Sequence, residues 1–145
     1  GYVACNDIVR DYLINRSRQF IYTSALPTHL CNSALKAITI AKEGILQRKL
    51  FKNVRFLQNG LKKIGYDTGN SVSQIIPIRI NSENVAVKLG NRLLQKGIFV
   101  HPMRFPTVKK GHAVLRLSVS AAHTKEQLHY TLEELENIGR NFKVI

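Results

Sequence analysis

Hydrophobic residues recur every three or four positions through the middle of the chain, which is the spacing of an amphipathic helix. Over residues 28–64 this stripe predicts one very long helix or two helices in tandem, ended by Gly65. An element of this length is typical of a connection between two lobes. The stripe consists of Leu30, Ala34, Ile38, Ala41, Ile45, Leu50, Val54, Leu57, Leu61 and Ile64.

The segment before this stripe predicts two short strands, at residues 2–4 and 20–23, with a helix between them. The helix begins near Asn6 or Asp7, because short polar side chains cap helix N-termini. Pro27 breaks the pattern before the long helical stretch. One side of the first helix is apolar and carries Ile8, Val9, Tyr12 and Leu13.

The rest of the chain alternates between strand and helix patterns. Apolar and β-branched runs predict three strands, at residues 75–80, 98–100 and 115–119. A helix over residues 81–96, stopped by Gly97, separates the first two. Thr124 and Gln127 have the spacing of a capping box for a last helix. Its buried stripe is Leu128, Leu132, Leu135 and Ile138. These elements predict a small α/β layer of strands covered by helices.

Length and composition indicate a globular chain with one core. The 145 residues are 44% hydrophobic, which excludes intrinsic disorder. No apolar run approaches the roughly 20 residues that span a bilayer, and the N-terminus lacks the pattern of a signal peptide. Cys5 and Cys31 do not make a disulfide framework or a CxxC pair. We therefore expect buried or inert thiols in a reducing, cytoplasmic compartment.

The net charge of +13, from 22 basic and 9 acidic residues, is large. It suits nucleic acid, an anionic membrane surface, or a polyanion such as coenzyme A (CoA) or a phosphate cofactor. The basic residues are spread along the chain and form no run of five or six, so most are expected on solvated faces. A non-catalytic basic module that binds nucleic acid or an acidic partner is the alternative hypothesis. Steep loss of affinity with rising salt would identify it.

Arg116 is the first candidate for chemistry. It lies between Leu115 and Leu117, which a strand directs to the opposite face. A guanidinium that projects from a sheet into a cleft is a good bidentate partner for a carboxylate. From the residues alone, a surface or ion-paired arginine is the other interpretation. None of the five histidines has metal-ligand spacing, and His123 is interpreted as a structural residue at the entry to the last helix.

The stretch RFPTVKKGHAVLRLSVSAAHT, from Arg104 to Thr124, resembles the C-terminal signature of the α-oxoamine synthases, roughly PPTVPxGxxRLRxxxxAxHT. FIYTSALPT resembles the FxxTxxLPP element of the same family. GYVA, KKIGYDTGNSVSQIIPIRI and RLLQKGIFV match further family segments in the correct order, so the resemblance covers nearly the whole chain. Two prolines of the signature are replaced, by Phe105 and Lys109.

The resemblance implies an enzyme dependent on pyridoxal 5'-phosphate (PLP), of fold type I, that condenses an amino acid with an acyl-CoA and releases carbon dioxide. Arg116 would hold the carboxylate of the amino acid, and Arg104 matches a substrate-binding arginine of the branch that makes 8-amino-7-oxononanoate. Thr23 and Ser24 would reach the PLP phosphate of the partner in a homodimer. Lys109 and Lys110 would be ordinary solvated lysines or lie near the phosphates of CoA.

The resemblance also implies a division of the chain. Residues 1–27 would be the tail end of the large PLP-binding domain, residues 28–64 the connecting helix or helix pair, and residues 65–145 a C-terminal small domain with a mainly antiparallel sheet. No lysine here has the family's Schiff-base context, so that lysine is expected upstream and this chain alone is expected to be inactive. No nucleic-acid partner is predicted. The acyl-CoA and the amino acid stay open.

Overall fold

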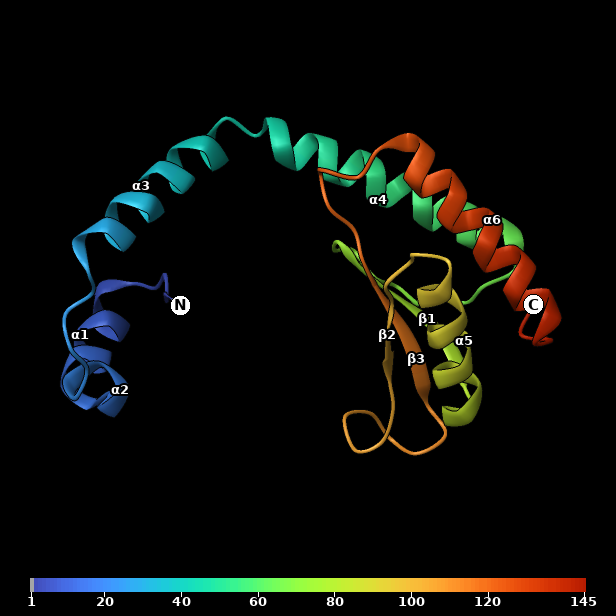
Figure 1. Ribbon diagram of the computed structural model, residues 1–145. Helices are drawn as coiled ribbons and strands as arrows, with labels where there is room; N and C mark the ends of the chain where they lie inside the picture. Colours follow the sequence, from blue (N-terminus) through green and yellow to red (C-terminus); the bar gives the residue numbers. More distant parts are fainter. Residues whose placement is uncertain (1) are drawn as a thin grey trace. The chain divides into compact units, whose positions relative to one another are not determined.

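The computed structural model describes residues 2–145, which fall into two compact units (Figure 1). One unit ends at Lys42, and the other runs from Glu43 to Ile145. Each unit is described by itself. Within residues 2–145, no helix combines the length and the apolar character that crossing a membrane requires.

The N-terminal unit contains three helices and none of them has a buried residue: α1 (Asp7–Arg16), α2 (Arg18–Ile21) and α3 (Thr28–Lys42). The Asn6 side chain caps α1 by accepting a hydrogen bond from the Val9 N–H at 3.0 Å, as predicted. Cys5 and Cys31 are free and exposed, so the expectation of burial is wrong within the described structure.

The two strands predicted near the N-terminus are wrong. Residues 2–6 have no regular structure, and Phe20 and Ile21 belong to α2. The backbone N–H groups of Phe20 and Ile21 both donate to the Ser17 carbonyl, at 3.1 and 2.9 Å. A strand needs a neighbouring strand to satisfy its backbone groups, and the structure places no strand in this unit. The local hydrogen bonds of a helix therefore replace it.

The long helical stretch consists of two helices, which confirms the tandem alternative. α3 ends at Lys42 and α4 (Ile45–Ile64) begins after Gly44. Gly44 has φ +70°, a left-handed conformation that an α-helix cannot continue through and that glycine adopts without strain. Gly65 ends α4 as predicted, with its N–H donating to the carbonyls of Leu61 and Lys62.

Three antiparallel strands form one sheet in the order β1-β3-β2: β1 (Ile75–Asn81), β2 (His101–Met103) and β3 (Ala113–Ser118). The strands predicted at residues 75–80 and 115–119 are confirmed, apart from shifts of one or two residues at their ends. The strand predicted at residues 98–100 is wrong, because β2 starts at His101. The Ile98 N–H still donates to the Leu93 carbonyl at 2.9 Å, so this segment is leaving the preceding helix rather than pairing with β3.

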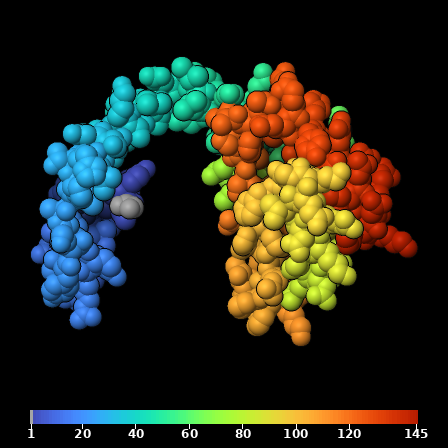
Figure 2. Space-filling view, in the orientation of Figure 1, coloured from blue at the N-terminus to red at the C-terminus, as the bar shows by residue number. Residues whose placement is uncertain are grey.

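Helices α5 (Glu83–Gln95) and α6 (Lys125–Asn141) complete the C-terminal unit. α5 packs on all three strands, and α6 packs on both α4 and α5 (Figures 1 and 2). In β3, Leu115 and Leu117 are buried while Arg116 and Ser118 are exposed, which confirms the predicted alternation. Thr124 and Gln127 form the predicted capping box of α6. In its stripe Leu128, Leu135 and Ile138 are buried and Leu132 is partly buried.

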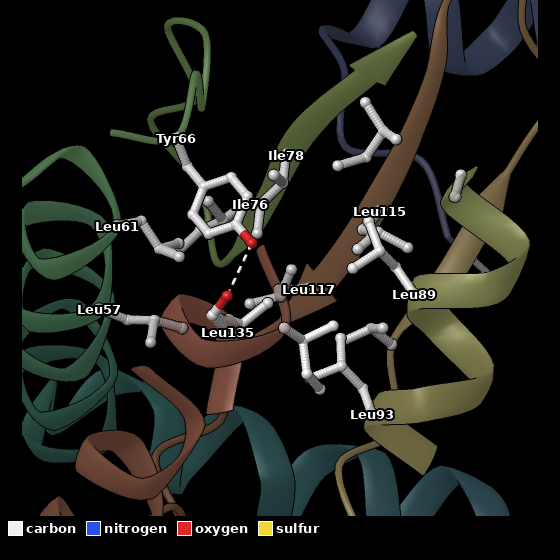
Figure 3. Close-up of a cluster of buried hydrophobic side chains, with 14 of the residues drawn as sticks. Leu57, Leu61, Tyr66, Ile76, Ile78, Leu89, Leu93, Leu115, Leu117 and Leu135 are labelled. Carbon is white, nitrogen blue, oxygen red and sulfur yellow. Dashed lines mark hydrogen bonds between the residues drawn. The ribbon is translucent and has the colours of Figure 1, made fainter. Parts of the chain in front are cut away.

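Tyr66 joins the end of α4 to α6. Its side chain is only 4% exposed, and its hydroxyl donates to the Leu135 carbonyl at 2.8 Å (Figure 3). Its ring lies against Gly139, where an added Cβ would overlap the Tyr66 hydroxyl and lie 2.9 Å from Cζ. Burial raises the pKa of the Tyr66 phenol to about 12. Gly139 therefore makes room for a buried polar anchor whose hydroxyl has a partner.

A matched pair of glycine substitutions tests this contact. Gly139→Ala should lower the free energy of unfolding by about 1–3 kcal/mol, because the new methyl group collides with the anchored Tyr66. Gly90→Ala in α5 should be neutral or stabilising by up to about 1 kcal/mol, since its Cβ would meet Pro102 at an ordinary 3.4 Å and alanine favours helix. Chemical denaturation of the chain measures both. Equal stabilities of the two variants would contradict the tight packing at Gly139.

The raised pKa of Tyr66 predicts a pH dependence of stability. The unfolded phenol loses its proton near its ordinary pKa of 10.0 and the folded one near about 12. The contribution of Tyr66 is therefore fully present below pH 10 and is lost as the pH rises toward 12, by up to about 1.4 kcal/mol per pH unit. Tyr66→Phe removes this slope. The difference in unfolding free energy between wild type and variant, measured from pH 8 to pH 12, should shrink as pH rises; a constant difference would rule the burial effect out.

Candidate functional site

Arg116 lies in the centre of the sheet, on the face that the helices leave open. In the register of the strands it is opposite Pro77 of β1 and His101 of β2. Its neighbours Leu115 and Leu117 point into the core and hold β3 in place. The Arg116 side chain is exposed, and no residue among 2–145 forms an ion pair or a hydrogen bond with its guanidinium. Its five N–H donors are therefore available to a ligand.

Arg79 lies on the same face of the sheet as Arg116 but has an ion-pair partner. Arg79 is in β1, opposite Val114 of β3. It lies two positions after Pro77, the residue opposite Arg116. Its guanidinium forms an ion pair with Asp67 at 3.0 Å. A hydrogen bond from the Gly69 N–H, together with the charge of Arg79, holds the pKa of the Asp67 carboxyl below its ordinary value. Of these two arginines on one face of the sheet, Arg79 is paired and Arg116 is available to a ligand.

Arg116 opens onto a pocket of about 450 Å³. The pocket lies where residues 97–100 run beside the end of β3 and the first turns of α6. Its walls are largely apolar and include Leu57, Leu117 and Leu128. Polar groups are contributed by His101 and Ser118 among others. An apolar hollow with a few convergent polar groups has the general make-up of a small-molecule site.

His123 stands at the entry to α6, as predicted, and also lines the pocket. Its Nδ1 accepts a hydrogen bond from the Ser120 N–H at 3.2 Å. Its carbonyl, with that of Ser120, accepts from the side-chain amide of Asn53 in α4. The structural role of His123 is therefore confirmed. These bonds fix the turn between β3 and α6, and with it one wall of the pocket.

Arg104 follows β2, at the end of the hairpin away from the pocket, and does not line it. Its carbonyl accepts hydrogen bonds from the N–H groups of Thr107 and Val108, which makes residues 104–108 a turn. Lys109 and Lys110 are exposed in the same loop, without an ion pair in the described part of the chain. The structure thus separates Arg104 from Arg116 along the strand direction.

Thr23 and Ser24 lie in the N-terminal unit, in the segment between α2 and α3. Both are exposed. The Thr23 hydroxyl makes only a long contact, 3.5 Å, to the Ser24 carbonyl. Two adjacent hydroxyls that face solvent can donate to the oxygens of a phosphate. Their chemistry therefore fits a phosphate group such as that of PLP.

Sequence reasoning missed His101 and Tyr130. His101 lines the pocket directly opposite Arg116, and the Tyr130 hydroxyl donates to the Lys96 carbonyl at 3.2 Å at the pocket's other side. The signal for His101 was its place at the start of a strand that pairs with Arg116. It was hidden because residues 98–100 have the more strand-like composition.

The remaining charged groups give no sign of a metal centre: no group of three or more His, Cys, Asp or Glu side chains within residues 2–145 could hold an ion. Beside the pocket, Glu126 is in the first turn of α6. Hydrogen bonds from its own backbone N–H and from the Thr124 hydroxyl lower the pKa of this carboxyl. An acidic group at this position also suits the positive end of the helix dipole.

The model of the family described as aminotransferase class I and II matches residues 1–135. The chain belongs to this family. It is 35% identical over 146 residues to an 8-amino-7-oxononanoate synthase from Exiguobacterium sibiricum, with 100% of this chain and 37% of that protein covered. A serine palmitoyltransferase from Sphingomonas wittichii has a similar structure, with a TM-score of 0.85 and 31% identity over 97% of this chain and 36% of that one.

These matches confirm the resemblance to α-oxoamine synthases and the α/β fold with a small antiparallel sheet. Enzymes of this family depend on PLP, and a further serine palmitoyltransferase of similar structure, with a TM-score of 0.82, contains it. The chain spans about 37% of the length of the relatives that it matches.

Proposed function

We propose that this chain is part of a PLP-dependent acyltransferase that joins an amino acid to an acyl-CoA with loss of carbon dioxide. In this proposal, residues 65–145 form its small domain and residues 1–27 belong to its large domain. Arg116 is the residue that holds the carboxylate of the amino acid. The observation that carries the proposal is that Arg116 lines a largely apolar pocket, and its guanidinium has no ion pair or hydrogen bond within residues 2–145.

The chemistry of carboxylate binding supports this role for Arg116. An arginine presents two parallel N–H donors that match the two oxygens of a carboxylate. Leu115 and Leu117 anchor the strand on either side, so the backbone beneath the guanidinium is held by the core. The pocket that Arg116 lines also has apolar side chains, Leu117 and Leu128 among them, which suit the non-polar part of a substrate.

PLP would be held in part by Thr23 and Ser24, whose exposed hydroxyls suit its phosphate. When bound, PLP supplies the electron sink for the bond-breaking step. In the proposed homodimer these hydroxyls serve the partner subunit's cofactor. The Schiff-base lysine would come from a part of the enzyme outside this chain. The amino acid and the acyl group stay open, and location in the cytoplasm stays a prediction.

The first test is the mass of the protein in the cell that makes it. We expect a polypeptide two to three times heavier than the 16.4 kDa of this chain, because the relatives are longer by about that factor. Intact-mass measurement of the protein isolated from its source decides this. A mass near 16.4 kDa would contradict the proposal that this chain acts within a PLP enzyme.

The second test is Arg116→Ala in the complete enzyme. We expect the KM for the amino acid to rise about 10- to 100-fold, as for the loss of a hydrogen bond to a charged group. The PLP absorbance should be retained, because Arg116 does not hold the cofactor. Arg116→Lys should give an intermediate KM, since lysine keeps the charge but loses the bidentate geometry.

The matched control for this test is Arg79→Ala. Arg79 is on the same face of the same sheet, but Asp67 already neutralises its guanidinium. Its removal should change the KM for the amino acid by less than about twofold, since exposed ion pairs contribute little. Equal effects of the two alanine variants, or an unchanged KM in Arg116→Ala, would place the carboxylate elsewhere.

A further inference from the structure

The two outer edges of the sheet are closed by the sequence itself. Pro77 in β1 and Pro102 in β2 have no N–H to offer at positions that face outward. The Arg79 N–H, next along the outer edge of β1, donates to the Asp67 carbonyl at 2.9 Å. Proteins block sheet edges in this way because unpaired backbone groups recruit other chains.

The central strand β3 nevertheless has one residue, Ser118, whose backbone N–H and C=O have no partner strand in the described part of the chain. We call this pair of unpaired groups the open rung. The Val119 N–H donates to the Gln74 carbonyl on the β1 side, at 2.9 Å. Backbone groups alternate in direction along a strand, so the N–H and the C=O of Ser118 face the β2 side. The register of β2 and β3 ends with His101 opposite Arg116, and its continuation by two residues would bring Phe99 opposite Ser118. β2 starts only at His101, and no hydrogen bond joins Phe99 to Ser118 in residues 2–145.

The open rung lies in the pocket already described, two residues from Arg116. Ser118, Arg116 and Phe99 all line it. The Phe99 side chain is 75% exposed, so most of it faces solvent. The rung is also single, because the next one along β3 is already closed by His101. A peptide that adds a strand to a sheet uses several consecutive rungs, so one rung in a pocket of about 450 Å³ favours a small molecule with an isolated amide.

We propose that Ser118 binds an amide of the pantetheine arm of the acyl-CoA donor. This inference rests on the proposed function. The carbonyl of a trans secondary amide can accept a hydrogen bond from the Ser118 N–H, but the N–H of the same amide points the opposite way. The Ser118 carbonyl therefore needs a second donor, which a neighbouring amide of the same ligand can supply. Pantetheine carries two such amides along an otherwise aliphatic chain, and that chain matches the apolar walls at Leu117 and Leu128. The net charge of +13 favours the phosphates at the far end of the same molecule.

Hydrogen exchange at single-residue resolution tests the proposal on the unaltered complete enzyme, with D-pantetheine as the probe. We expect the Ser118 amide to exchange rapidly in the free enzyme and at least about tenfold more slowly at saturating D-pantetheine. An unchanged rate overturns the proposal. Protection that is already present without D-pantetheine also overturns it, because another segment of the enzyme would then occupy the rung.

Two variants test the same contact by binding. Ser118→Pro removes the open N–H without removing a bond to β1, and Ser118→Ala keeps that N–H. We expect the inhibition constant of D-pantetheine to be about three- to tenfold higher in the proline variant than in the alanine variant, the effect of one hydrogen bond. Equal constants overturn the proposal. If the proline variant does not fold, the exchange experiment decides alone.

Failure of this inference can be separated from failure of the proposed function. An enzyme that consumes acyl-CoA while Ser118 stays unprotected refutes only the pantetheine contact. An enzyme that shows no turnover of acyl-CoA with any amino acid refutes the proposed function, whatever happens at Ser118. Because D-pantetheine carries no phosphate, its effect also separates amide recognition from attraction of the CoA phosphates to the basic surface.

Discussion

The buried hydrogen bond from the Tyr66 hydroxyl to the Leu135 carbonyl ties the end of α4 to α6 in the C-terminal unit. A buried hydroxyl must have a partner, and the absence of a side chain at Gly139 lets it reach one. The contact fixes α6 against the end of α4. Helix α6 also supplies one wall of the pocket. The position of that wall relative to Arg116 therefore depends on the contact of Tyr66 with Leu135 and Gly139.

The sheet separates structural from chemical roles by the alternation of its side chains. Leu115 and Leu117 are buried and contribute to the core, while Arg116 is exposed on the opposite face. Arg79, on the same face, is neutralised by Asp67, whereas Arg116 has no such partner within residues 2–145. The exposed guanidinium of Arg116 is therefore free to bind an anion bidentately.

The N-terminal unit has a different physical character. None of its helices has a buried residue, although the sequence has the apolar stripes of packed helices. The stripes in α3 therefore have no partner among its own residues, and Thr23 and Ser24 lie exposed beside them. The chain spans only 37% of the length of its relatives. In the proposed function, residues 1–27 of this unit belong to the large domain, and α3 is part of the connecting helix pair.

The sequence by itself determined the helices other than α2, the two long strands, the caps at Asn6, Gly65 and Thr124, and the family, because these depend on local periodicity, on capping chemistry and on a motif of fixed spacing. It could not determine the fate of residues 98–100, whose strand-like composition is overridden by the hydrogen bond of Ile98 to the end of α5. Nor could it pair His101 with Arg116 or leave the Ser118 rung open. Those features depend on which segments meet across the sheet, and only the tertiary structure decides that.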